Sequence, residues 1–150
     1  MRNILLALVP ALAVVLFLAW PRGSTEPLHV VPQTLARLEA LKPQLSFAPD
    51  AADGYTGVAS LAERAQASAQ FARLIDDLAR DLPRHPDKRF VLARFKTTLR
   101  ALELSDTEDR ERATLYCEKI MDVLGIRSSD GTLNAWLYGP LLGPLVGRHV

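Results

Sequence analysis

Apolar residues in the middle of the chain recur at the spacing of an α-helical face. From residue 60 to residue 82 they advance in alternating steps of four and three, the period of one side of a helix. This stripe comprises Leu61, Ala65, Ser68, Ala72, Ile75, Ala79 and Leu82, and Phe71 and Leu78 widen it. Ser60 and Glu63 have capping-box spacing, and Pro83 follows the stripe. The pattern predicts a long helix over residues 60–82.

Two further stretches predict long helices. Residues 86–102 can open at Pro86, and residues 105–124 begin with a second capping-box pair, Ser105 and Glu108. Gly125 can adopt the left-handed conformation that ends a helix. The apolar stripes are Leu92, Phe95, Leu99 and Leu102 in the first stretch, and Ala113, Cys117, Ile120 and Leu124 in the second.

Two short helices complete the pattern. They are residues 33–42, with Leu35, Leu38 and Leu41 on one face, and residues 129–138, with Leu133, Trp136 and Leu137 on one face. No stretch alternates apolar and polar residues as a half-buried strand would. We therefore predict an all-α fold: a small up-down helical bundle of three long and two short helices over residues 33–150. The expected core contains Phe47, Phe71, Phe90, Phe95 and Trp136.

An apolar segment precedes the bundle. Residues 3–20, NILLALVPALAVVLFLAW, carry no charge and follow Arg2, which is the pattern of a secretory signal. The run of residues 4–20 would form a helix of about 25 Å, the short limit for a bilayer core of roughly 30 Å. Phe17, Trp20 and Pro21 stand where a cleavage site needs small residues. We therefore expect an uncleaved signal anchor over residues 1–22; a cleaved signal peptide and a buried N-terminal hydrophobic helix remain alternatives.

The flanking charges give this anchor a direction. Arg2 and the α-amino group precede the apolar run, and Arg22 follows it. The excess of positive charge before the apolar run places the N-terminus on the cytoplasmic side of the membrane. We expect a single-pass protein of the bacterial inner membrane with its domain on the periplasmic side, or a secreted protein if the segment is cleaved. Residues 23–32, which contain Gly-Ser and two prolines, are the predicted linker.

The composition of the chain limits the classes of partner that we expect. The chain has 150 residues, which suggests one folded domain, and a formal charge of +1. Without residues 1–22 it carries 16 basic and 17 acidic side chains, so we expect no nucleic-acid partner. Cys117 is the single cysteine and cannot form an internal disulfide. We expect a small buried residue there, with an intermolecular disulfide as the alternative.

The stretch GIRSSDGTLNAWLYG, residues 125–139, gathers residues that a ligand site uses. Ser128 or Ser129 can cap the short helix, and Asp130 is expected in its first turn, facing the positive end of the dipole. Every residue thus has a structural explanation. The alternative is a polar pocket for a small ligand, formed by Asp130, Asn134, Trp136 and Tyr138.

Two charged clusters also invite a functional interpretation. Asp106, Glu108, Asp109 and Glu111 could bind a metal, but acids are favoured in any first helical turn, and Glu108 with Arg112 has the spacing of a solvated pair. Lys88, Arg89, Lys96 and Arg100 could contact an acidic partner or anionic lipid. Antiparallel packing could instead neutralise this basic helix against the acidic start of the next one.

Signatures of catalysis are absent from the sequence. His29, His85 and His149 have no metal-ligand spacing, and the chain contains no GxSxG, P-loop, GxGxxG, HExxH or CxxC motif. We therefore expect no catalytic residue, no metal and no cofactor. The apolar C-terminal tail, PLLGPLVGRHV, is too short to span a bilayer.

Three runs carry a family resemblance. DTEDRER (106–112), EKIMDVLGI (118–126) and SSDGTLNAWLYG (128–139) resemble an uncharacterised family of small bacterial proteins, classed as a domain of unknown function, with similar TEDRER and SSDGxLNxWLYG runs. The resemblance covers residues 33–139 and implies a helical domain, without any activity or site residue. The anchor, the amphipathic helices and the lack of catalytic signatures favour a non-enzymatic, membrane-tethered interaction module of the bacterial envelope with an envelope protein as partner. A small-ligand-binding or hydrolytic protein is the alternative.

Overall fold

A computed structural model describes residues 26–104 and 106–139. They form α2 (Pro32–Leu41), the 3-10 helix η1 (Lys42–Gln44), α3 (Leu61–Asp81), α4 (Lys88–Arg100), α5 (Thr107–Leu124) and α6 (Thr132–Tyr138). These described ranges contain isolated β-bridges but no β-strand. The all-α prediction is confirmed, with three long helices and two short ones.

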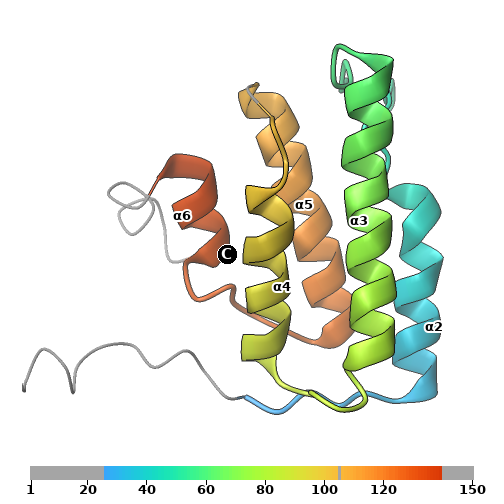
Figure 1. The fold of residues 1–150 in the computed structure, drawn as a ribbon, viewed down its shortest axis with the longest axis vertical. Helices are drawn as coiled ribbons and strands as arrows, with labels where there is room; N and C mark the ends of the chain where they lie inside the picture. The colour runs from blue at the N-terminus through green and yellow to red at the C-terminus, as the bar shows by residue number, and fades with distance from the viewer. Residues whose placement is uncertain (1–25, 105, 140–150) are drawn as a thin grey trace, which may run out of the picture.

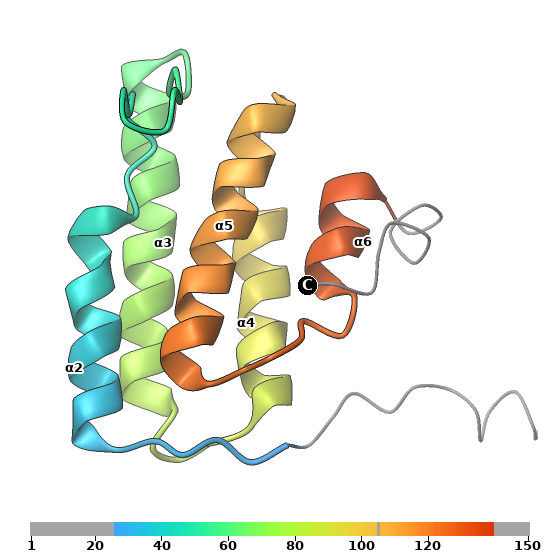
Figure 2. The same cartoon turned by 180° about the vertical axis from the view of Figure 1, so that it is seen from behind.

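Four of the helices form the bundle and the fifth leans against it. α2, α3, α4 and α5 run up, down, up and down along a common direction (Figure 1). α2 packs against α3 and α5, and α3 packs against α4. α6 lies beside this bundle and contacts α4 and α5 (Figure 2). The short helix α2 is thus a fourth member of the bundle, whereas α6 covers its side as predicted.

The helix starts are set by side chains that accept hydrogen bonds from free backbone N–H groups. Ser60 accepts from the Glu63 N–H at 3.4 Å, as its spacing predicts. α4 is capped by Asp87, which accepts from Phe90, so Pro86 lies before the helix and does not open it. α5 is capped by Asp106, and Ser105, the predicted cap, lies outside the described residues. Gly125 ends α5 at φ +71°, as predicted.

The core is centred on three aromatic rings from different elements. Phe47 follows η1, Phe71 lies on α3 and Tyr116 lies on α5, with ring centroids 5.3–5.7 Å apart. Phe47, Phe71 and Phe95 are fully buried, as predicted. Phe90 and Trp136 are half-buried and pack at the edge of the core.

The buried face of α3 differs from the predicted stripe. Leu61 is 78% exposed and Ala65 is also exposed. The buried residues of this helix are Ala67, Phe71, Leu74, Ile75 and Leu78. The helix is rotated toward its bulkier side chains because a buried Phe or Leu removes more apolar surface from water than Ala does. The regular spacing of the apolar residues, taken by itself, therefore predicted the wrong buried face for the first half of this helix.

The membrane predictions concern residues that the structure does not describe. Within residues 26–104 and 106–139, no helix is both long and apolar enough to cross a bilayer. Residues 4–20, which carry the predicted anchor, and the apolar tail from residue 140 onward lie outside the described residues. Cys117 is described, and it is free and fully buried, in agreement with the first of its two interpretations.

Candidate functional site

The candidate ligand segment begins with two left-handed residues. Asp130 has φ +51° and Gly131 has φ +76°, so the helix starts only at Thr132. The prediction that Asp130 lies in the first helical turn is therefore wrong. Aspartate tolerates the left-handed region better than most residues, which allows this sharp turn. The Ser128 hydroxyl accepts from the Asp130 N–H at 3.1 Å, and the Ser129 hydroxyl accepts from the Leu133 N–H at 3.5 Å.

Asp130 is bound by a buried lysine from α4. The Lys88 ammonium, whose side chain is 5% exposed, lies 2.8 Å from the Asp130 carboxylate and 3.9 Å from that of Glu26. The Lys88 N–H also donates to the Glu26 carbonyl at 3.0 Å. This group joins three distant segments at the base of the bundle. Lys88, a predicted partner or lipid contact, is therefore engaged inside the domain.

A cleft lies between α4 and α6. Its volume is about 560 Å³, within the usual range of small-molecule sites. The side chains that define it are Lys96, Leu99 and Arg100 of α4, and Asp130, Thr132 and Trp136 of the α6 segment. The structure thus brings two of the four proposed ligand residues together with two of the four basic residues.

The other proposed site residues lie elsewhere. Asn134 is buried, and Tyr138 is 42% exposed at the end of α6. Neither contributes to the lining of the cleft, and neither does Arg89, which is exposed nearer the start of α4. The four residues Asp130, Asn134, Trp136 and Tyr138 therefore do not converge on this one cavity.

Trp136 is held in position by α5. The Arg110 guanidinium lies over the indole, 5.0 Å from the ring centroid, and its Nη2 donates to the Trp136 carbonyl oxygen. Such a cation–π contact fixes the ring and leaves it half-buried. One wall of the cleft is therefore an aromatic surface that Arg110 supports from α5.

Lys96 and Arg100 stand one helical turn apart at the cleft, and both are exposed. No ion pair joins either of them to a carboxylate among the described residues. The predicted neutralisation against the start of α5 is therefore not formed at these two residues. Three of the four acids there are otherwise engaged: Asp106 caps the helix, Glu108 accepts from Thr56 and Asp109 accepts from Tyr55.

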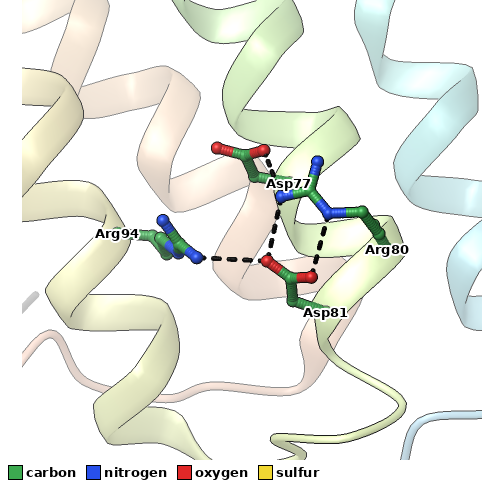
Figure 3. A network of polar contacts seen from close by, with 4 residues as sticks. All are labelled: Asp77, Arg80, Asp81 and Arg94. Carbon is green, nitrogen blue, oxygen red and sulfur yellow. Dashed lines mark hydrogen bonds and ion pairs between the residues drawn. The ribbon is translucent and has the colours of Figure 1, made fainter.

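Arg94 of α4 has a structural role that differs from the position of Lys96 and Arg100. Arg94 of α4 donates to Asp81 at 3.1 Å, and Arg80 binds the same carboxylate at 3.0 Å and Asp77 at 2.6 Å (Figure 3). The hydrogen bonds from Arg80 lower the pKa of Asp81. This network ties the end of α3 to α4. Within residues 26–104 and 106–139, no carboxylate pairs with Lys96 or Arg100 in this way.

The DTEDRER run acts as a structural anchor for a loop. Asp109 accepts a 2.6 Å hydrogen bond from the Tyr55 hydroxyl. Arg112 lies over the Tyr55 ring, 4.2 Å from its centroid, and pairs with Asp53 at 3.0 Å. The expected Glu108–Arg112 pair is absent from the ion pairs of the described residues, because Arg112 turns to the loop. Tyr55 and Asp53 were not found from the sequence, since more than fifty residues separate them from these partners.

We predict a pH-dependent contribution from Tyr55. Burial, and then the hydrogen bond to Asp109, raise the pKa of Tyr55 above its ordinary value near 10. A raised folded pKa contributes stability that is complete below about pH 10 and is lost as pH rises further, because the unfolded tyrosine ionises first. Urea unfolding followed by circular dichroism should show Tyr55→Phe about 1.5–3 kcal/mol less stable at pH 8. The difference should shrink by pH 11, and a constant difference would contradict the prediction.

No described group of three or more His, Cys, Asp or Glu side chains could hold a metal ion. This finding concerns residues 26–104 and 106–139 alone. The prediction that the protein uses no metal and no cofactor remains a prediction.

Comparison with known proteins identifies the family. The family DUF4844, described as a domain of unknown function, matches residues 29–140. The fold is similar to the crystal structure of a DUF3571 family protein from Acinetobacter baumannii AYE, at a TM-score of 0.64 and 30% identity, over 77% of this chain and 96% of that one. No curated protein matches the chain. The resemblance to an uncharacterised helical family is confirmed, and the chain belongs to DUF4844, a domain of unknown function.

Proposed function

We propose that the chain is a non-enzymatic binding module of the bacterial envelope, held at the inner membrane by residues 4–20, and that the cleft between α4 and α6 is its binding surface. Its helical domain then lies on the periplasmic side. If residues 1–22 are cleaved, the same domain acts as a secreted module. The binding surface and the tether are separate parts of this proposal and are tested separately.

One observation carries the binding surface: two cations that pair with no carboxylate of the described residues line the same cleft as a half-buried indole. Lys96 and Arg100 line the same cavity as Trp136, which Arg110 holds from behind. Arginine and tryptophan are enriched among the residues that dominate binding energy at interfaces. Both charges are therefore available to an acidic group of a partner.

The tether is supported by the uncharged, apolar sequence of residues 3–20 and by the short segment that separates it from the base of the bundle. Glu26 is bonded to Lys88 at the base of the bundle, so five residues separate this base from Trp20, the last residue of the apolar run. Five extended residues and their joining bonds reach at most about 21 Å. The base would therefore be close to the bilayer surface.

The second candidate is a small-ligand or hydrolytic protein that uses the same region. The cleft volume favours the first of these, and Asp130 and Trp136 do line it. For hydrolysis, the described lining offers no imidazole or thiol, and Asp130 is bound by Lys88. A binding function requires neither an imidazole nor a thiol.

Two measurements on the full chain test the proposal. A photo-reactive amino acid at position 96 should form specific adducts in cells, and the same group at Arg89, exposed on the same helix but outside the cleft, should not. Equal labelling at both positions, or none at 96, would count against the cleft. Separately, the full chain should resist alkaline extraction from membranes, whereas a chain starting at residue 23 should be released.

A further inference from the structure

We infer that the α4–α6 cleft binds a single-chain amphiphile with an anionic headgroup, the chain between the two helices and the headgroup at Lys96 and Arg100. This inference rests on the proposed function, because it names the ligand class for the same cleft. Three properties of the cleft lead to it: its walls, its charges and the length of α6.

The walls of the cleft favour a ligand with a large apolar part. The half-buried Trp136 and Ala135 of α6 face the cavity, and Leu99 of α4, which is only 1% exposed, lies beneath its lining. A hydrocarbon chain placed against this apolar surface gains free energy from leaving water.

The charged side chains that line the cleft favour an anionic headgroup. Lys96 and Arg100 contribute two positive charges one turn apart, and Asp130, the acid of the lining, is offset by Lys88 at 2.8 Å. The net charge around the cleft is therefore positive. Arginine and lysine together are well suited to a phosphate or carboxylate oxygen cluster.

The dimensions of the cleft disfavour a peptide as its occupant. α6 has seven residues and extends over only about 10 Å, so it offers little length for a docked helix or strand. A bound peptide would also bury amide groups beside helices whose own backbone groups are already paired. Each unpaired amide would cost about 1–3 kcal/mol, a penalty that a hydrocarbon chain avoids.

Residues 23–150 provide a direct test, because Trp136 is their only tryptophan. This part contains the whole described core, and the Acinetobacter baumannii protein matches it over 96% of its own length, so such a domain folds by itself. A cooperative thermal transition is the first requirement. Dodecyl phosphate, added below its micelle concentration, should then shift the Trp136 emission to shorter wavelength in a saturable way.

Two reference compounds separate the parts of the ligand. Inorganic phosphate has the charge without the chain, and dodecyl maltoside has the chain without the charge. Each should bind at least about tenfold more weakly than dodecyl phosphate. If phosphate binds equally well, the cleft is an anion site; if the maltoside does, it is an apolar groove. Either result overturns the inference.

Matched charge reversals localise the headgroup. Arg100→Glu and Lys96→Glu should each weaken dodecyl phosphate binding about tenfold, and Arg89→Glu should leave it unchanged. All three positions are exposed on α4, so folding should be unaffected, as circular dichroism can verify. Equal loss for Arg89→Glu would mean that the whole face of α4 attracts anions, and would overturn the inference.

The failures are distinguishable. If dodecyl phosphate does not bind but position 96 still forms specific adducts in cells, the inference fails and the proposed binding surface stands. If the full chain is not membrane-bound but the amphiphile binds, the tether fails and the inference stands.

Discussion

Replacing Phe71 with alanine is expected to lower the free energy of unfolding by about 3–5 kcal/mol, the largest effect of any single substitution considered for this protein. The ring is fully buried and packs at 5.7 Å from Phe47 and 5.5 Å from Tyr116. It joins α3 to the segment after η1 and to α5. Its removal leaves a cavity where three elements meet, and the surrounding helices can close it only in part.

Urea unfolding of residues 23–150, followed by circular dichroism, measures this effect. Leu61→Ala is the matched control on the same helix: it removes a side chain that belongs to the regular stripe but is 78% exposed. It should change stability by no more than about 0.5 kcal/mol. Similar losses for both variants would mean that α3 presents the face predicted by spacing, and that the observed rotation is wrong.

Replacing Leu133 with alanine should detach α6 from the bundle. Leu133 is fully buried, and truncation of such a leucine costs about 2–5 kcal/mol. A helix of seven residues is too short to persist without packing, so losing this contact should release the whole element. The cleft would then lose one wall, while α2 to α5 keep their shared core.

Two readouts report this release. Trp136 emission should move to longer wavelength as the indole enters water, and binding of dodecyl phosphate should be lost although most of the helical circular dichroism remains. Leu137→Ala is the control, because Leu137 is only half-buried and is not packed against the core cluster. If Leu137→Ala has the larger effect, α6 docks through a different face from the one observed.

The family motif illustrates how structural and functional signals can be confused. Its acidic residues resembled a metal site, yet Asp109 and Arg112 hold the Tyr55 loop, and Arg110 holds Trp136. The motif therefore supports the cleft from behind without lining it. Its contribution to function, in our proposal, is to position the indole.

The candidate site was only partly predictable. Asp130 and Trp136 were placed in one ligand group from their closeness in sequence, and Lys96 and Arg100 in another from their helical spacing. The cavity combines half of each group, because α4 and α6 meet side by side. Lys88 could not be recognised as an internal residue, since its partners Asp130 and Glu26 are far from it in the chain.

Local information was sufficient for the helices themselves. Periodic apolar residues, the Ser60 cap and the left-handed Gly125 determined the existence, type and approximate ends of all five helices, because helical hydrogen bonds and caps join residues only a few positions apart. The rotation of α3, the pairing of Lys88 with Asp130 and the cleft beside Trp136 were decided only by tertiary structure. Each depends on which surfaces pack most apolar area and which charges meet across the bundle, and these contacts join residues that no spacing in the sequence connects.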